Sequence, residues 1–592
     1  MLMDTSGITL IKSRIEDKHK GDAKQLEVVF SPHKRLLVEA PAGYGKTHTM
    51  VSRIAYLIAI GQIPVPKRLL ALTFSVNAAY KIKKDVSKNI PELLEGLNKQ
   101  IRIKEKTYIS NYHGFCRSVL KKYGHILHPA LSHLDTLQSV DDSKSDAIMR
   151  SFKTISLDEA NILSDFNSGV KTIHGRYLKE NIDKYNSVVI SELLPKKAIP
   201  FNAIITLTIK LFQECPNILT FYQNYYTSIL VDEFQDTNLL SYWLLHFLVT
   251  EKTNLLFLGD SLQRIYGFIG AVPNLLSRAK EMFNLELITL DKNYRFASNE
   301  NMLRLDRIIR QNALTPFKNP GALNSKIEFN IYEDQAKEAL EVVIKSQAIL
   351  HEHPSSNVAI LAKQRGLNIE QIINTFNCNK IPFFYGLFSD EDPEYVKFNR
   401  KCLYEFIELL KMQTKVTKKC GQKHIEKIKE LYVDNDSPTV KALFQLLDIF
   451  WSRVFVDYSF LSNEDKINLI KDTFEHNGIK QYMEFLDTKI IISTVHAAKG
   501  LEWDYVILPD MEKDSFPNYY GLCSKCKCGT DCNLIVNKEI ENSFLEELSV
   551  FYVAVTRARK QVYFTASNTQ LTKYGASEKN YSCFMKLPGI EF

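Results

Sequence analysis

The sequence predicts an α/β protein built on two parallel sheets, each interrupted by a mainly helical insertion. Two observations lead to this fold class. Buried strands alternate with helices from residue 35 onward, and the same alternation restarts after residue 295. Two long stretches, 88–225 and 388–485, carry helical patterns and many charges but no strand pair.

The first sheet begins with an apolar strand at 35–40, which a glycine-containing turn joins to a helix at 47–60. A second buried strand at 69–74 and a helix at 76–88 follow. This strand–helix–strand order is typical of a parallel sheet with covering helices. After the first helical stretch we expect three more strands, at 227–232, 254–259 and 285–290.

The second sheet is expected to contain five strands, at 326–332, 357–361, 489–494, 504–508 and 561–565. These patterns divide the chain into six consecutive segments. The first sheet-bearing domain covers 1–88 and 226–295 around an insertion at 89–225. The second covers 296–387 and 486–592 around a shorter insertion at 388–485, with a cysteine-rich insertion at 521–533.

Composition narrows the class of protein. A chain of 592 residues suggests about four domains at roughly 150 residues each. The 45% of hydrophobic residues exclude general disorder, and a net charge of +7 permits a nucleic-acid partner without requiring one. No apolar run reaches the roughly 18 residues of a membrane span, and we expect no membrane partner. Ten cysteines are too sparse for a disulfide scaffold, which predicts a reducing, cytoplasmic setting.

A phosphate-binding loop follows the first predicted strand. Residues 40–47 read Ala-Pro-Ala-Gly-Tyr-Gly-Lys-Thr, with alanine in the place of the first glycine of that motif. The following helix presents its N-terminal dipole to an anion, Lys46 can reach the β- and γ-phosphates, and Thr47 can ligate Mg²⁺. A glycine-rich turn without a ligand is the alternative. The predicted nucleotide site consists of Ala40, Pro41, Ala42, Gly43, Tyr44, Gly45, Lys46, Thr47 and His48.

Two acidic residues end the predicted strand at 227–232, within the run ILVDEFQDT. The C-terminal edge of a parallel sheet is where ligands bind. Asp232 would hold Mg²⁺, and Glu233 would activate a water against the γ-phosphate. A solvated turn would explain the two acids alone, but not their occurrence together with a phosphate loop.

These two motifs resemble those of the UvrD/Rep/PcrA family of superfamily 1 DNA helicases. The resemblance implies two RecA-like domains and an ATP-driven, Mg²⁺-dependent motor with 3′→5′ polarity on single-stranded DNA, or on DNA with a single-stranded tail. It extends over residues 25–559. Six further segments are similar to family motifs and occur in family order: Leu72–Ala79, Asn111–Phe115, Gly259–Ala271, Leu290–Arg295, Ser493–Asp504 and Tyr552–Arg559.

The resemblance also implies roles for single residues. Arg295 and Arg557 match two arginines that close on the γ-phosphate from the second domain, where guanidinium groups neutralise developing charge. Taken singly, each arginine is more typical of a surface ion pair. Four more residues match other positions of the nucleotide site. Gln25 would read adenine, and Tyr294 would stack on it. Gln263 and Glu502 would sense γ-phosphate and ribose.

The DNA side would use aromatic rings, on which bases stack at about 1–3 kcal/mol each without sequence preference. Two positions depart from the family: Phe268 stands where tryptophan is usual, and Ile269 where arginine is usual. Phe74 and Phe268 could instead be core rings. The matching positions are Phe74, His113, Tyr266 and Phe268, with Thr494 and His496 at backbone-contacting positions.

Four cysteines lie in one decapeptide, at 523, 526, 528 and 532. Four thiolates suit a tetrahedral, structural Zn²⁺. The spacing is tighter than in paired zinc knuckles and does not match the ferredoxin run, so an iron–sulfur cluster is disfavoured. A metal-free segment remains the other alternative. The proposed zinc ligands are Cys523, Cys526, Cys528 and Cys532.

A second function fits the same motifs. The chain could be an ATP-gated sensor or regulatory subunit that binds DNA and switches a protein partner, such as a nuclease or another factor of DNA repair or anti-phage defence. The insertion at 388–485 is shorter than usual for the family, which makes processive unwinding less secure than translocation. Strand displacement measured beside DNA-stimulated ATP hydrolysis distinguishes the two functions.

Overall fold

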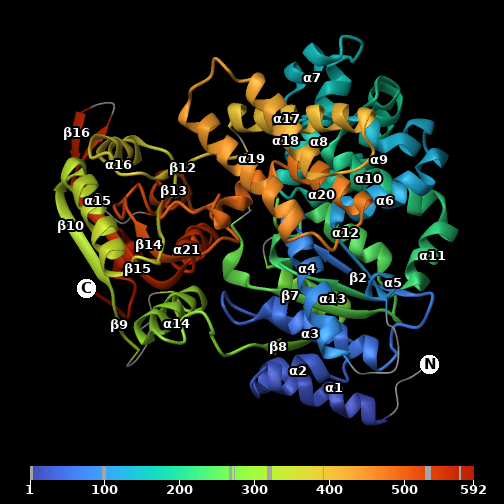
Figure 1. Cartoon of the computed structure of the whole chain (residues 1–592), viewed down its shortest axis with the longest axis horizontal. Helices are drawn as coiled ribbons and strands as arrows, with labels where there is room; N and C mark the ends of the chain where they lie inside the picture. Colours follow the sequence, from blue (N-terminus) through green and yellow to red (C-terminus); the bar gives the residue numbers. More distant parts are fainter. Residues whose placement is uncertain are drawn as a thin grey trace. The chain divides into compact units, whose positions relative to one another are not determined.

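The computed structural model describes residues 5–95, 102–265, 270–272, 274–316, 323–390, 392–526, 535–572 and 575–592. They form two compact units, Met1–Lys292 and Asn293–Phe592, each with its own parallel sheet (Figure 1). The predicted α/β class with two parallel sheets is therefore confirmed. Within the described residues, no helix is both long and apolar enough to cross a membrane.

The first sheet has six parallel strands in the order β3-β2-β6-β7-β1-β8. Because all strands run the same way, their C-terminal ends share one edge, which carries the phosphate loop and the acidic pair. The strands are β1 (Arg35–Glu39), β2 (Arg68–Thr73), β3 (Thr107–Asn111), β6 (Tyr226–Val231), β7 (Asn254–Gly259) and β8 (Glu286–Thr289).

Both faces of this sheet are buried. Leu36 and Val38 of β1 join one hydrophobic core, whereas Leu37 points into the other. The first core is covered by α1 (Thr5–Lys18), α2 (Ala23–Phe30), α3 (Lys46–Ala59), α4 (Val76–Leu93) and the short α5 (Ile103–Lys106). In Figure 1, α1 and α2 lie below the sheet and α7–α10 lie above it.

The second core is the larger one and holds most of the helical insertion. Its helices are α6 (Tyr112–Tyr123), α7 (Ser145–Ser151), α8 (Leu157–Lys171), α9 (Gly175–Val188), α10 (Phe201–Glu214), α11 (Pro216–Tyr225), α12 (Leu239–Leu248) and α13 (Leu275–Phe283).

The expectation that 88–225 contains no strand pair was wrong. β3 pairs in parallel with β2 at the edge of the main sheet, and a short ribbon joins β4 (Gln138–Val140) to β5 (Ala198–Pro200). β3 reads Thr-Tyr-Ile-Ser-Asn and alternates buried with half-buried residues. An edge strand needs fewer apolar residues than a central one, so its hydrophobic pattern is weak.

The second sheet has six parallel strands in the order β10-β15-β14-β11-β13-β12, and β16 pairs antiparallel with β15. β12, at the far edge, was not predicted because it has only three residues. The strands are β10 (Glu328–Asp334), β11 (Val358–Ala362), β12 (Phe384–Gly386), β13 (Ile490–Thr494), β14 (Trp503–Leu508), β15 (Ala558–Thr572) and β16 (Gly575–Glu578), with β9 (Ser325–Lys326) pairing β17 (Ile590–Glu591) separately.

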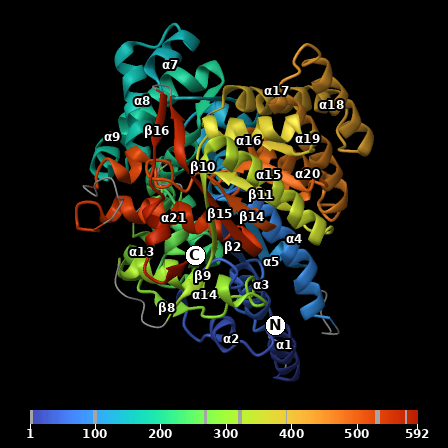
Figure 2. The same cartoon turned by 90° about the vertical axis from the view of Figure 1, so that its left-hand side faces the viewer.

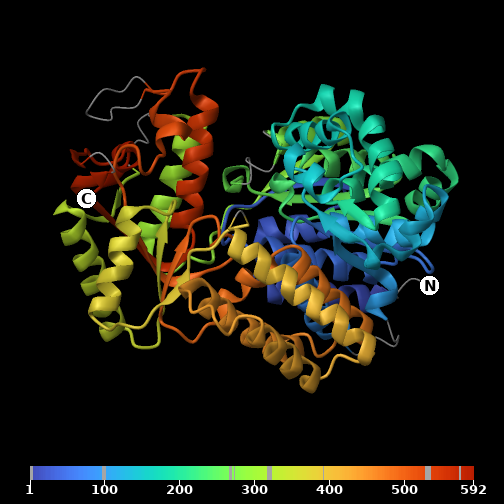
Figure 3. The ribbon, with the colours of Figure 1, turned by 90° about the horizontal axis from the view of Figure 1, so that it is seen from above.

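Helices cover both faces of the second sheet as well (Figures 2 and 3). Neighbouring rings of β15 show the alternation: Tyr563 packs on the core formed with α15 (Gln335–Glu352) and α16 (Leu367–Cys378). Phe564 instead contacts Phe551 of α21 (Glu541–Val555), with ring centroids 5.9 Å apart. The unit opens with α14 (Glu300–Leu314).

The predicted helical block at 388–485 contains four long helices, α17 (Pro393–Met412), α18 (Lys418–Glu430), α19 (Pro438–Val456) and α20 (Asn463–Glu475). Side-chain oxygens of Asp392 and Ser437 cap α17 and α19, and proline occupies the first turn of each helix. The block therefore begins its helices with ordinary sequence signals, which is why it could be predicted.

A buried histidine holds this block together. His424 donates from Nε2 to the carbonyl of Cys402 at 2.8 Å and accepts at Nδ1 from the indole of Trp451 at 3.0 Å. These contacts require the neutral ring. Burial lowers the pKa of His424 to about 4, so the ring stays neutral well below neutral pH.

Candidate nucleotide and DNA site

The predicted phosphate loop joins β1 to α3 and is shaped for an anion. Gly43 and Gly45 have positive φ angles of 84° and 81°, which only glycine adopts at no cost. Gly45 caps α3 without any side-chain hydrogen bond. The N–H groups in the first turn of a helix have no acceptor within the helix. Those of α3 can therefore donate to a phosphate, which the helix dipole also attracts.

Lys46, the first residue of α3, is buried next to three carboxyl groups. Its Nζ lies 3.2 Å from Glu233 Oε1, but this ion pair lacks hydrogen-bond geometry, and the nitrogen has no hydrogen bond among the described residues. Burial by itself would lower the pKa of Lys46, but Glu233, Asp260 and Asp232 together raise it. A charged, buried ammonium without a hydrogen bond fits the role of binding phosphate.

Asp232 follows β6 directly, and its backbone N–H donates to the carbonyl of Leu72 in the next strand at 2.9 Å. Its Oδ2 accepts a long hydrogen bond, 3.5 Å, from the Thr47 hydroxyl. Burial and the charge of Glu233 raise the pKa of Asp232 to about 6. A hydroxyl and a carboxylate oxygen this close, with excess negative charge, fit a Mg²⁺ ion.

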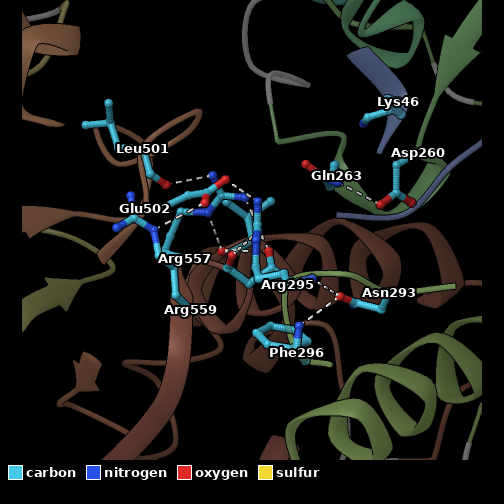
Figure 4. A network of polar contacts seen from close by, with 12 residues as sticks. Lys46, Asp260, Gln263, Asn293, Arg295, Phe296, Leu501, Glu502, Arg557 and Arg559 are labelled. Carbon is cyan, nitrogen blue, oxygen red and sulfur yellow. Dashed lines mark hydrogen bonds and ion pairs between the residues drawn. The ribbon is translucent and has the colours of Figure 1, made fainter. Parts of the chain in front are cut away.

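A glutamine that sequence reasoning missed orders the acidic loop. Gln235 is buried, donates from Nε2 to Glu233 Oε2 at 2.5 Å and accepts the N–H of Asp260 at 3.1 Å. Asp260 Oδ2 in turn accepts from Gln263 Nε2 at 2.8 Å (Figure 4). The glutamine stands two residues after Glu233 in the run ILVDEFQDT, so its position in the motif was visible, but its partners were not.

Gln25, the predicted adenine reader, lies in α2 against the phosphate loop. Its Nε2 donates to the carbonyl of Tyr44 at 3.0 Å, and its Oε1 pairs with Nδ1 of His19 at 2.5 Å. A Cβ at position 45 would come within 2.5 Å of the Gln25 amide nitrogen, so glycine there is what lets the amide approach. His48, also predicted at this site, lies with its ring centroid 4.4 Å from that of His19.

The second unit gathers arginines around Glu502. Arg295 pairs through Nη2 with Glu502 and donates from Nη1 to the carbonyl of Thr556, while Arg559 Nε lies 3.6 Å from Glu502 Oε2 (Figure 4). The backbone N–H of Arg295 donates to Asn293 Oδ1 at 2.9 Å, which fixes the turn that presents this arginine. Sequence reasoning identified Arg295 and Glu502 but neither Arg559 nor the Thr556 carbonyl.

Arg557 is buried and is held by its own unit. It donates to the carbonyls of Val553 and Leu501, at 3.0 Å each. Tyr294, the predicted adenine-stacking ring, is 37% exposed. The structure thus brings Arg295, Glu502 and Arg557 together within the second unit and leaves Tyr294 at its surface.

Two of the predicted DNA-contacting residues lie at neighbouring strand ends of the first sheet. Phe74 follows β2 and is half-buried, and His113 is the second residue of α6, which begins directly after β3. The ring of His113 stacks on Phe201, with centroids 3.6 Å apart. Phe201 is 39% exposed and was missed, because it stands at the start of α10, far from any motif. Tyr266 and Phe268 lie outside the described residues.

Thr494 is the last residue of β13 in the second unit, and His496 follows it, near three lysines. Burial, followed by the charges of Lys363, Lys499 and Lys480, lowers the pKa of His496 to about 4. The ring is therefore neutral, and the positive charge at this strand end comes from lysine. Such charge is suited to a phosphate backbone.

Comparison with known proteins identifies the family. The family model described as the UvrD/REP helicase N-terminal domain matches residues 22–284, and that of the UvrD-like helicase C-terminal domain matches residues 394–569. The chain belongs to the UvrD-like helicase family. It is similar to the ATP-dependent DNA helicase PcrA of Staphylococcus epidermidis (strain RP62A) and of Staphylococcus aureus (strain Mu50). Each is 25% identical, over 95% of this chain and 86% of the relative.

Membership of the UvrD-like helicase family confirms the predicted resemblance and the class of enzyme. The two parallel sheets are the RecA-like domains expected of that family. The family assignment does not test the role of any single residue, so the residue roles below are proposals.

The cysteine cluster of this UvrD-like helicase is only half described. Cys523 is buried at the end of a turn, and its Sγ lies 3.4 Å from the Pro517 carbonyl oxygen. Cys526 is disulfide-bonded, so it would bind zinc only after reduction to the thiolate. Cys528 and Cys532 lie outside the described residues. The zinc site therefore stays a prediction.

One more acidic group of the helicase lies in the second unit, away from the predicted site. Glu338, Asp510 and Glu512 place carboxylate oxygens within 4.8 Å of one another. Burial and the charge of Asp510 raise the pKa of Glu338 to about 7, and burial also raises the pKa of Glu512. Thr565 and Ser567 donate hydrogen bonds to this group, which marks it as a buried polar network of the fold.

Proposed function

We propose that this UvrD-like helicase is an ATP-driven, Mg²⁺-dependent motor that moves 3′→5′ along single-stranded DNA and separates duplexes with a single-stranded tail. The observation that carries the proposal is the buried Lys46 ammonium, which ends the phosphate loop and pairs with Glu233 beside Asp232. In this proposal the segments 89–225 and 388–485 are insertions of the two RecA-like domains.

Lys46 and Glu233 would exchange partners during the reaction. Glu233 Oε1 now pairs with Lys46, and Oε2 accepts from Gln235. An incoming triphosphate offers Lys46 a stronger anion, which frees Oε1 to accept a proton from the attacking water. Thr47 and Asp232 would hold Mg²⁺, whose charge assists the transfer of the phosphoryl group.

Arg295 and Arg557 would supply the remaining positive charge for the transferring phosphoryl group, as arginines do in related hydrolases. Arg557 is fixed by two backbone carbonyls, so it would act from a rigid position. Arg295 instead pairs with Glu502, a contact that it can give up for phosphate.

A short hydrogen-bonded path supports coupling between hydrolysis and DNA. Thr237, four residues after Glu233, pairs its hydroxyl with that of Tyr112 at 3.2 Å. Tyr112 immediately precedes His113, which stacks on Phe201. A shift of the acidic loop would therefore reach a ring on which a base can stack.

The alternative, an ATP-gated sensor that switches a partner such as a nuclease, uses the same residues up to hydrolysis. The two functions differ in whether the protein separates the strands of DNA. Relatives named DNA helicase favour the motor, because a switch needs no strand separation.

Strand displacement on matched tailed duplexes tests the proposal. The purified chain with ATP and Mg²⁺ should displace the strand of a duplex with a 3′ tail and leave the same duplex with a 5′ tail intact. Lys46→Ala serves as the inactive control. DNA-stimulated hydrolysis without displacement of either duplex would support the sensor, and displacement only from the 5′ tail would reverse the polarity.

A further inference from the structure

A chain of hydrogen bonds runs behind the predicted adenine-reading residue. His19 follows α1, is 2% exposed and pairs through Nδ1 with Gln25 Oε1 at 2.5 Å. Its Nε2 pairs with the hydroxyl of Ser52 in α3 at 2.8 Å. Gln25 completes the chain through Nε2, which donates to the Tyr44 carbonyl at 3.0 Å.

The Tyr44 carbonyl indicates which way the Gln25 amide faces, because a carbonyl oxygen only accepts. Gln25 turns its NH₂ group toward Tyr44 and its oxygen toward His19. That oxygen needs a donor, so Nδ1 of His19 carries the hydrogen. Burial lowers the pKa of His19, and in the neutral ring Nε2 then accepts from Ser52. The chain fits a neutral histidine in one tautomer.

We propose that His19 is a positioning residue that locks the side-chain amide of Gln25 in one orientation and thereby sets the preference of this enzyme for adenine nucleotides. The inference rests on the proposed function, in which Gln25 reads the base. His19 itself would not touch the nucleotide, since its two ring nitrogens are both occupied within the first unit.

The preference follows from base chemistry. Adenine presents an amino donor at N6 beside an acceptor at N7, and a glutamine amide matches the two with its oxygen and its NH₂ group. Hypoxanthine carries an acceptor in place of the amino group, so an amide of fixed orientation faces it oxygen to oxygen. An amide turned the other way matches neither the amino group nor N7 of adenine, so the adenine preference is lost. Such base discrimination is worth roughly 5- to 150-fold in affinity.

The test compares two variants of nearly equal shape. In His19→Asn the side-chain NH₂ group can still donate to Gln25 Oε1, whereas His19→Asp offers only acceptors at that place. Affinities of ADP and IDP are measured by calorimetry on the full chain with Mg²⁺. Melting temperature and poly-dT-stimulated ATP hydrolysis are recorded for each variant.

We expect the wild-type chain to bind ADP at least about five-fold more tightly than IDP, and His19→Asn to preserve that ratio. His19→Asp should bring the ratio close to one, with the loss falling on ADP affinity and on KM for ATP more than on kcat. If His19→Asp does not fold, His19→Glu takes its place, because it too offers only acceptors. An ADP preference that survives in His19→Asp or His19→Glu would overturn the inference.

Gln25→Ala separates this inference from the proposed function. If Gln25→Ala loses the ADP preference while His19→Asp keeps it, the inference alone fails. A wild-type chain that shows no ADP preference overturns the inference, even if it hydrolyses ATP on DNA. A chain that binds both nucleotides but never hydrolyses ATP with poly-dT overturns the proposed function instead.

Discussion

The two groups of predicted catalytic residues have opposite charge balances. In the first unit a single buried ammonium, Lys46, lies among three carboxyl groups, those of Asp232, Glu233 and Asp260. In the second unit, Arg295 and Arg559 both approach one carboxylate, Glu502. Arg557 donates to the backbone carbonyls of Val553 and Leu501.

This difference in charge balance indicates a different contribution from each unit. In the proposed function the first unit would cradle phosphate and hold a metal ion, but its excess of negative charge would leave a developing phosphoryl charge poorly stabilised. The second unit has arginines in excess and no phosphate loop among its described residues. Binding and transition-state stabilisation are therefore expected to respond to mutations in different units.

The largest effect is expected from the second unit. Arg295→Ala should lower kcat for DNA-stimulated ATP hydrolysis by about 10³–10⁵-fold, because the charge on the transferring group loses its partner. Arg295→Lys should rescue little, since a single ammonium cannot reproduce the two-pronged contact. Steady-state phosphate release measures both. Arg304→Ala, an exposed arginine on α14, is the matched control, and an equal loss there would refute the assignment.

Glu233→Gln tests the first unit. The amide cannot take a proton from water, so kcat should fall by about 10²–10⁴-fold. ATP binding should persist or tighten, because Lys46 no longer has a competing carboxylate. A fluorescent nucleotide titration beside the hydrolysis assay checks both halves, with Glu251→Gln as control. Normal hydrolysis by Glu233→Gln would remove Glu233 from the role of base.

The predicted DNA-stacking rings give the next effect. Replacing Tyr266 and Phe268 together with alanine should weaken single-strand binding between about ten- and ten-thousand-fold, at about 1–3 kcal/mol for each lost stack. Hydrolysis should lose its stimulation by DNA. An unchanged dissociation constant for poly-dT would assign both rings to the core instead.

Acid should lower the stability of the helical block of the second unit. The native pKa of His424 is about 4 and the unfolded value is near 6.5, so between these pH values only the unfolded chain binds the proton. Unfolding free energy should fall by about 1.4 kcal/mol for each pH unit below 6.5. His424→Gln keeps a donor for the Cys402 carbonyl and an acceptor for Trp451 but does not titrate.

Denaturant unfolding followed by tryptophan fluorescence at pH 7 and pH 5 measures this slope, because Trp451 contacts the ring. The exposed His33→Gln is the control. We expect the pH dependence to be shallower only in His424→Gln. Equal slopes in all three proteins would show that the buried ring does not carry the acid sensitivity.

The smallest effect is expected from the cysteine cluster. One zinc ion per chain should be found by elemental analysis under reducing conditions without chelator, because four thiolates suit a tetrahedral ion. Cys526→Ser/Cys528→Ser should lose the metal, keep the main melting transition and lose part of the stimulated hydrolysis. Zinc content near zero in the wild-type protein would refute the site.

The sequence predicted the central strands of both sheets because these strands are continuous apolar runs with glycine-rich or acidic turns after them. It did not predict β3, whose buried residues alternate with half-buried ones and leave no apolar run, or β12, which has only three residues. Among the proposed site residues, the places of Lys46 and Asp232 in the fold could be predicted, since each stands in a motif that follows a strand; their roles stay predictions.

The partners of those residues could not be predicted from the sequence. Gln235 bridges Glu233 and Asp260, and the second of these lies 25 residues away in the sequence. His19 bonds to Gln25 and to Ser52, although no motif includes His19. Phe201 meets His113 across 88 residues of helical insertion. Such contacts depend on packing, which a linear pattern does not encode.

Hydrolysis of ATP by the purified chain, titrated with poly-dT, tests the central claim most directly. Wild-type turnover should rise at least about ten-fold with DNA and fall to background in Lys46→Ala, which lacks the charge that neutralises phosphate. Arg295→Ala should also fail to turn over, but should bind a fluorescent ATP analogue as tightly as the wild type. Hydrolysis that ignores DNA, or that survives in Lys46→Ala, would contradict the account.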